Sequence, residues 1–311
     1  MAQLTSADLK EFPSFYDSPR DIGDVLIGED TARPLIEASS SGNDTALQSL
    51  LSQPQWIKIM LEKPHRIYEL ERDPSASPNG LRRVQAMRIS NLEQALIAAA
   101  VTRHATTVST LLAFAKQQGI SASSILSIST MNKIIRAGDV AVMKALVSAD
   151  PEGILNFRLG HGGELPLYEA VRLRQHEIVA LLLEFGADPL HPARQGKVLG
   201  TYRSSLMSFA AFAGTRMTEM LLERGVPVAN TGALHSAASA GRLDTMELLM
   251  QHGADVNEVI WRNWTPMHFA AWRGRVEAMK LLEDSGARSD AKDEDGKTPA
   301  QVLEERNAAK D

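Results

Sequence analysis

The sequence predicts an all-α fold built from stacked helix–turn–helix units. The clearest unit is residues 263–290, which read NWTPMHFAAWRGRVEAMKLLEDSGARSD. Pro266 suits the first turn of a helix, where its missing N–H would have no partner. Apolar residues recur at helical spacing on both sides of Gly274, so two short helices are expected. Each helix has an apolar face that a single unit cannot bury, and the unit therefore requires neighbours.

Neighbouring units appear as a recurrence every 33 residues. The recurring pairs are His235 and His268, Gly241 and Gly274, Gly253 and Gly286, and Thr265 and Thr298. Both threonines are followed by proline. Gly253 and Gly286 follow the second helix of their units, where a helix commonly ends on a residue in the left-handed conformation. We expect both glycines in that conformation.

This period and the Thr-Pro-Met-His start at residues 265–268 resemble the ankyrin repeat family. The resemblance is strongest over residues 233–257 and 265–290. It implies a β-turn and two antiparallel helices per repeat, stacked into a curved solenoid. It also implies that the protein binds other proteins and is not an enzyme.

The Thr265 position sets a register for the whole chain, and we number the repeats by it. Equivalent four-residue slots begin at residues 33, 94, 129, 165, 205, 232, 265 and 298. The third slot is degenerate. The eighth is followed by one predicted helix, residues 299–306, with charged residues where a stacking face would lie, as in a terminal cap. We predict about eight repeats over residues 31–311.

Two insertions interrupt this register, at about residues 54–91 and 190–204. The first contains a predicted short helix at residues 54–63 and a predicted flexible loop at residues 73–80. Trp56 has apolar neighbours in that helix and is expected in the core, not at a ligand contact.

Residues 1–30 predict a flexible acidic tail, because they hold seven acidic and two basic residues with little periodicity. The net charge of the chain is −5, so the remaining residues are neutral in sum. A neutral body argues against direct nucleic-acid binding, which requires a basic surface. The tail also contains the aromatic residues Phe12, Phe15 and Tyr16. They allow two roles for the tail, a docking or activation motif or packing on the first repeat.

Composition restricts the chemistry and the compartment. The chain has no cysteine, which excludes disulfides, thiolate catalysis and cysteine-type zinc sites. This fits a reducing intracellular compartment, cytoplasmic or nuclear. No signal peptide is visible, and no apolar run approaches the roughly 20 residues of a membrane helix, so no membrane association is expected.

No catalytic motif stands out, and we expect no catalytic residue, cofactor or metal. The sequence lacks a P-loop, GxGxxG, GxSxG and HExxH. His161 precedes two glycines and is expected in a turn between repeats. His161 and His191 lack a third ligand, which makes a poor metal site. By the family resemblance, His235 and His268 hold the turns of their repeats.

The candidate binding residues are concentrated in the seventh repeat. The resemblance implies that partners contact the turn tips and the concave side of the first helix. There the seventh repeat carries Trp261, Arg262, Trp264, Trp272 and Arg273, including three of the four tryptophans of the chain. Tryptophan and arginine are enriched at binding hot spots. The alternative is that Trp264 and Trp272 pack between repeats. Further candidates are Arg172, Tyr202, Phe212, Glu294 and Asp295.

We therefore predict a monomeric, non-enzymatic scaffold or adaptor for another protein. The partner segment is expected to be an apolar helix or extended peptide with some acidic character. The alternatives are a nuclear transcriptional coregulator that uses the acidic tail, and a regulator or inhibitor of an enzyme. The segment from Leu249 to Asn257 also resembles the pattern that asparaginyl hydroxylases accept, although asparagine has an ordinary role in turns.

Overall fold

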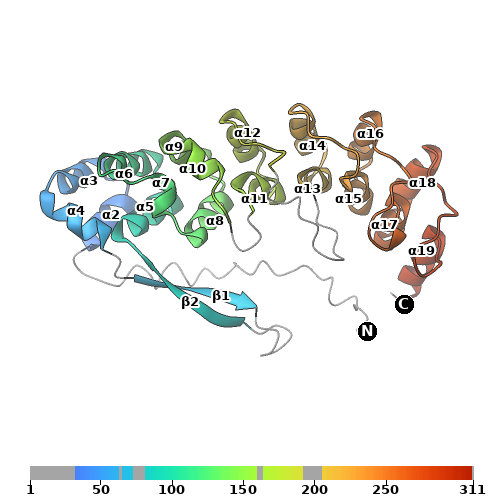
Figure 1. Ribbon diagram of the computed structural model, residues 1–311, viewed down its shortest axis with the longest axis horizontal. Helices are drawn as coiled ribbons and strands as arrows, with labels where there is room; N and C mark the ends of the chain where they lie inside the picture. The colour runs from blue at the N-terminus through green and yellow to red at the C-terminus, as the bar shows by residue number, and fades with distance from the viewer. Residues whose placement is uncertain (1–31, 63–64, 73–80, 160–163, 192–204, 310–311) are drawn as a thin grey trace. The chain divides into compact units, whose positions relative to one another are not determined.

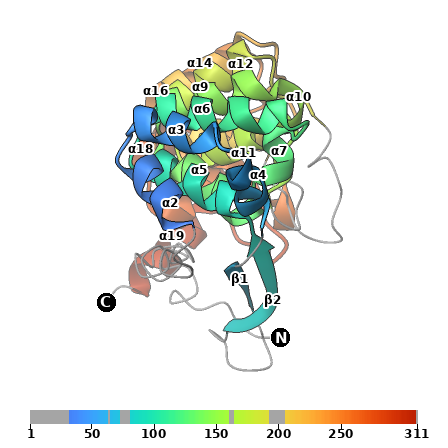
Figure 2. The ribbon, with the colours of Figure 1, turned by 90° about the vertical axis from the view of Figure 1, so that its left-hand side faces the viewer.

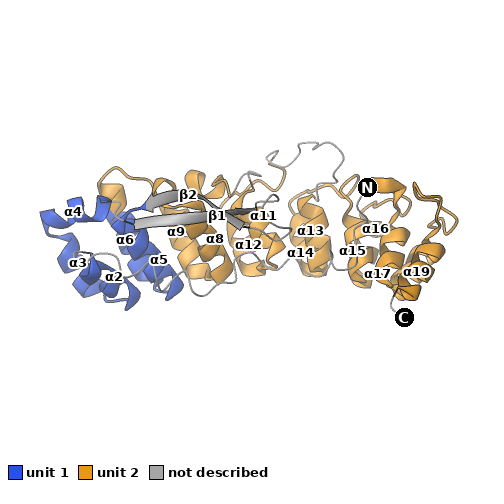
Figure 3. Cartoon of the chain, turned by 90° about the horizontal axis from the view of Figure 1, so that it is seen from below, with its two compact units in different colours: residues 1–114 blue, residues 115–311 orange. Residues whose placement is uncertain are grey.

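The computed structural model of the chain describes residues 32–62, 65–72, 81–159, 164–191 and 205–309. The predicted tail at residues 1–30 and most of the second predicted insertion, residues 192–204, lie outside these ranges. The chain divides into two compact units at residue 114, coloured separately in Figure 3. Each unit is described by itself below.

The first unit contains α2 (Arg33–Ser40), α3 (Asp44–Leu51), α4 (Pro54–Leu61), α5 (Asn91–Val101) and the first part of α6 (Ala105–Gln117), which face the viewer in Figure 2. Helix α2 packs against α5, and α4 also packs against α5. Helix α4 confirms the helix predicted in the first insertion. Trp56 on this helix is only 6% exposed, so the prediction that it belongs to the core is confirmed.

A β-hairpin follows α4, and the sequence did not predict it. Strand β1 (His65–Arg72) pairs antiparallel with β2 (Leu81–Ile89), with His65 opposite Ile89 and Arg72 opposite Leu81. The register shifts between Glu69 and Leu70. The loop predicted at residues 73–80 lies outside the described part of the chain. The helical solenoid is thus confirmed, with this hairpin inserted between its first two helix pairs.

The second unit continues the helix pairs. Its elements are α7 (Ala122–Ile125), α8 (Ile128–Ala137), α9 (Val140–Ala149), α10 (Pro151–Leu155), α11 (Pro166–Arg172), α12 (His176–Glu184), α13 (Leu206–Ala213), α14 (Thr215–Leu222), α15 (Ala233–Ala240), α16 (Leu243–Gln251), the 3₁₀ turn η2 (Trp261–Asn263), α17 (Pro266–Arg273), α18 (Val276–Asp284) and α19 (Pro299–Ala308). First helices pack on first helices, from α11 through α13, α15 and α17 to α19. Second helices pack on second helices, from α12 through α14 and α16 to α18, and Figure 1 shows the two rows.

From α11 onward the helix starts follow the predicted register. Helices α11, α13, α15, α17 and α19 each begin one residue after the start of their slot. Helices α5 and α8 begin earlier than their slots, because Ser90 and Ser127 cap them with side-chain hydrogen bonds. The third slot therefore lies inside α8. The total of about eight repeats stays a prediction.

Local backbone geometry confirms the predicted helix ends. Gly253 has φ +84° and Gly286 has φ +89°, both left-handed. Gly274, which ends α17, has φ +65°. Among the helices that the structure describes, none has the length and apolar character to cross a bilayer.

Candidate protein-binding surface

Two buried histidines, His235 and His268, each hold the next turn against the start of their own helix. The Nδ1 atom of His268 lies 2.9 Å from the hydroxyl of Thr265, and its Nε2 donates to the carbonyl of Lys297 over 3.2 Å. In the preceding repeat, Nε2 of His235 donates to the carbonyls of Glu258, at 2.9 Å, and Trp264, at 3.2 Å. These bonds show the structural role that the family resemblance implied. They also fix the turns that carry the candidate residues.

The turn before α17 is tight and places two tryptophans together. Its residues Arg262 and Asn263 both have positive φ, at 60° and 58°. The N–H of Ile260 donates to the carbonyl of Trp264 over 3.1 Å and closes the turn. The rings of Trp261 and Trp264 consequently lie 6.4 Å apart, and Trp261 is 47% exposed.

Trp264 is the centre of an aromatic cluster. Its ring meets Phe269 edge to face at 5.2 Å and Trp272 at 5.9 Å, and it stacks on His268 at 6.1 Å. Its indole N–H donates to the carboxylate of Asp293 over 3.2 Å. Trp264 thus packs within the repeat stack, as the packing alternative expected. Trp261 and Trp272 extend the same cluster towards solvent, Trp272 being partly exposed.

The two candidate arginines of this repeat differ in their partners. Arg262 lies over the ring of Trp261 at 5.5 Å and pairs with Asp295, and also with Glu294 at 4.0 Å. The two predicted acidic contacts are therefore already paired within the molecule. Arg273 lies over the ring of Trp272 at 4.3 Å and makes no ion pair with any described residue.

The described candidates from the fourth and fifth repeats, Arg172 and Phe212, have contacts outside this cluster. Phe212 on α13 is 42% exposed, with the guanidinium of Arg174 5.4 Å from its ring. Arg172 binds the carboxylate of Glu169 through two hydrogen bonds, of 2.8 and 2.5 Å. Tyr202 lies outside the described residues. Phe212 and Trp272 nevertheless occupy the same position in their repeats, seven residues after the slot begins.

Comparisons with known proteins settle the nature of the repeats. A family model for ankyrin repeats in many copies matches residues 234–283, and a model for a single ankyrin repeat matches residues 162–194. This is an ankyrin repeat protein. Ankyrin repeats are in general modules that bind other proteins. No curated protein matches the sequence.

Solved ankyrin repeat domains share the fold. The ankyrin repeat domain of Bcl-3, described as a unique member of the IkappaB protein family, has a TM-score of 0.53 at 24% identity, over 67% of this chain and 92% of that one. The human ASB11 ankyrin repeat domain has a TM-score of 0.54 at 26% identity, over 70% of this chain and 97% of that one.

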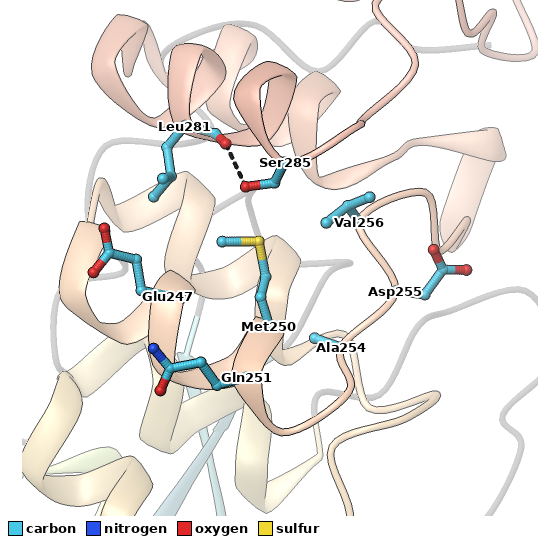
Figure 4. A pocket seen from close by; sticks show the side chains of 8 residues that line it. All are labelled: Glu247, Met250, Gln251, Ala254, Asp255, Val256, Leu281 and Ser285. Atoms are coloured by element: carbon cyan, nitrogen blue, oxygen red, sulfur yellow. Dashed lines mark hydrogen bonds between the residues drawn. The ribbon is translucent and has the colours of Figure 1, made fainter.

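A hollow lies on the second helices of the sixth and seventh ankyrin repeats (Figure 4). Its volume is about 500 Å³, and the walls come from α16, the turn after it, and the end of α18. The side chain of Ser285 there is engaged with the carbonyl of Leu281 at 2.7 Å. The lining residues are Glu247, Met250, Gln251, Ala254, Asp255, Val256, Leu281 and Ser285. None of them belongs to the predicted binding residues.

The ankyrin turns carry other polar groups that serve the fold. The side-chain oxygen of Asn257 accepts the N–H of Arg288 over 2.8 Å and joins two successive turns, an ordinary role for asparagine. Modification of Asn257 stays a prediction.

His191 belongs to no candidate metal site, since no group of three histidine and carboxylate side chains suited to a metal occurs in the part of the chain that is described.

Several residues of this surface were not predicted from the sequence. Phe269 precedes Trp272 by three positions, and helical spacing would have placed both on one face. Asp293, which bonds Trp264, and Arg306, which reaches α17, belong to the next repeat. Their roles depend on contacts between repeats and leave no local signal.

Proposed function

We propose that this ankyrin repeat protein is a non-enzymatic scaffold or adaptor that binds another protein through its seventh repeat. We name the group Trp261, Arg262, Trp264, Trp272 and Arg273 the tryptophan surface. The observation that supports the proposal is the contiguous contact of its three indole rings, with Trp261 47% exposed. Exposed aromatic clusters are typical of binding sites.

The tryptophan surface is held in place before any partner binds. Trp264 is fixed by Asp293 and by its stacking on His268, and Trp272 rests edge to face on Trp264. A rigid surface loses little conformational entropy on association, so more of its contact energy appears as affinity. This supports an apolar partner segment, either a helix or an extended peptide.

We expect an acidic residue of the partner to bind Arg273. The guanidinium of Arg262 is already paired with Asp295, whereas Arg273 has no carboxylate partner among the described residues. A partner carboxylate therefore gains more at Arg273. Phe212, Arg172 and Tyr202 stay proposed as flanking contacts, and the coregulator and enzyme-regulator alternatives stay open because both depend on the tail or the partner.

We expect Trp272→Ala to weaken partner binding by roughly 2 kcal/mol or more, about 30-fold in affinity, with a much smaller loss in folding stability. The measurement is affinity capture with the wild type followed by titration of the captured partner, alongside the thermal midpoint of each variant. Val276→Ala is the matched control, because Val276 is an exposed apolar residue, 56% accessible, on the second helix of the same repeat. An unchanged affinity with a large fall in midpoint would assign Trp272 to the core and remove the tryptophan surface.

A further inference from the structure

The hollow between α16 and α18 has an apolar floor. The first helices α15 and α17 pack closely, whereas the second helices α16 and α18 touch over a short stretch only. The side chains of Met250, Val256 and Leu281 point into the space between them (Figure 4), and all three are partly exposed. The volume of about 500 Å³ lies in the range of about 300–1,000 Å³ that is typical of ligand pockets. The hollow is thus an apolar surface with room for the side chains of a partner.

The charged groups that line this hollow are acidic. Glu247 on α16 is exposed and forms no ion pair with a described residue. Asp255 lies in the following turn, where one of its carboxylate oxygens accepts the N–H of Asn257 over 2.8 Å. The lining contains no lysine, arginine or histidine, so these two carboxylates give it a formal charge of −2. The single basic residue of α18, Lys280, does not belong to the lining.

We propose that this hollow binds a segment of another protein in which an arginine or lysine lies between apolar residues. The apolar residues would cover the floor formed by Met250, Val256 and Leu281. The basic residue would lay its aliphatic stem on the same floor and bring its charged end to Glu247. An acidic segment would instead place like charges beside two carboxylates.

The flexible side chain of Met250 suits such a site, because methionine adapts to apolar groups of different shape. The site goes beyond the proposed function. It shares no residue with the tryptophan surface, and it selects a basic segment, whereas Arg273 favours an acidic one.

The test follows the methyl group of Met250 by NMR in the full chain, labelled at its methionine methyl groups. The signal is assigned by its absence from Met250→Leu. Three capped peptides are titrated into the millimolar range: Ala-Leu-Arg-Leu-Ala, Ala-Leu-Glu-Leu-Ala and Ala-Ser-Arg-Ser-Ala. We expect the first to shift the Met250 signal saturably and to bind about fivefold more tightly than the glutamate peptide, the effect of one partly exposed ion pair. The serine peptide should bind more than about tenfold more weakly, because it lacks both leucines.

A charge-removing variant tests the role of Glu247. Glu247→Gln should lose the preference for the arginine peptide over the glutamate peptide while still binding both through their leucines. Glu304→Gln is the matched control and should keep the preference. Glu304 is an exposed glutamate on α19, outside the hollow, and forms no ion pair with a described residue.

The outcomes separate the hollow from the tryptophan surface. A Met250 signal that none of the peptides shifts overturns the site. Equal affinity for the arginine and glutamate peptides overturns it too, as does an unchanged preference in a folded Glu247→Gln. A shift that persists in Trp272→Ala supports a second, independent site. Loss of the shift in a folded Trp272→Ala would assign the peptides to the tryptophan surface and overturn the proposal for the hollow.

Discussion

At the scale of single residues, His235 and His268 both bond the following turn, but their Nδ1 atoms have different partners. Thr265 supplies a hydroxyl to Nδ1 of His268. The equivalent position in the sixth repeat is Gly232, so Nδ1 of His235 has no hydrogen-bond partner among the described residues and instead lies 3.8 Å from the carboxylate of Glu258. With glycine in place of threonine, the imidazole at the start of α15 is thus held by groups of the next turn, the carbonyls of Glu258 and Trp264 and the carboxylate of Glu258.

The burial of His235 predicts a loss of stability in acid. Burial lowers its pKa from 6.5 to about 4. Between these values the unfolded chain binds a proton that the folded chain does not, so stability falls as the pH decreases from about 6.5 towards 4. The full effect is about 3 kcal/mol. Urea unfolding at pH 7 and pH 4.5 should show a larger acid loss for the wild type than for His235→Gln.

Glu258 has a raised pKa because of burial and works in the opposite direction, but it is present in both proteins. The comparison of the two pH differences therefore isolates His235. Equal acid losses in the two proteins would mean that His235 is already protonated, or exposed, in the folded state.

At the scale of elements, the second helices end on glycine for conformational reasons. A β-carbon added to Gly253 would meet no heavy atom within 4 Å, yet its φ is +84°. Space is therefore available and only the backbone conformation is demanding. Gly274 differs, because a side chain there would displace Arg306.

We expect Gly253→Val to destabilise the protein by about 1 kcal/mol or more, because β-branched residues are strained in the left-handed region. Gly253→Asn should cost less, since asparagine tolerates that region. Thermal unfolding followed by circular dichroism measures both. An unchanged midpoint for the valine variant would contradict the register of the sixth repeat.

At the scale of the whole molecule, each described repeat of the second unit packs on its neighbours, and α19 is the packing partner of α17. Helix α19 covers α17, and Val302 is buried at this contact. The turn before α19 also supplies Asp293 to Trp264 and the carbonyl of Lys297 to His268. Helix α19 and the turn before it thus support the tryptophan surface.

Truncation after residue 297 should therefore loosen the seventh repeat before the others. Loss of the Val302 contact alone removes roughly 2 kcal/mol of apolar burial. We expect a red shift of tryptophan fluorescence and a lower midpoint, with most far-UV helical signal retained. Truncation after residue 309 is the control, because it keeps all of α19. Unchanged fluorescence in the shorter protein would show that the tryptophan surface does not depend on α19.

The sequence by itself determined the helical repeat, its register from residue 165 onward and the glycines at the helix ends. Proline at the first turn, the histidine three residues after Thr265, and Gly253 and Gly286 act through contacts within a few residues, so local rules predict them. The sequence also placed three tryptophans in the seventh repeat, because the position of a residue within a repeat follows from the repeat pattern alone.

Only the tertiary structure decided which groups are paired. Arg262 is neutralised by Asp295 and Glu294, and Trp264 is tied to Asp293, across about 30 residues of sequence. Arg306 of the last helix lies against Gly274, and Arg275 lies against Gly241 of the preceding repeat. Such pairings follow from how the turns of adjacent repeats stack, and the free energy of each depends on the side chain that the neighbouring repeat presents. The β-hairpin β1–β2 belongs here too, because its pairing joins two segments on either side of an insertion that the repeat pattern does not describe.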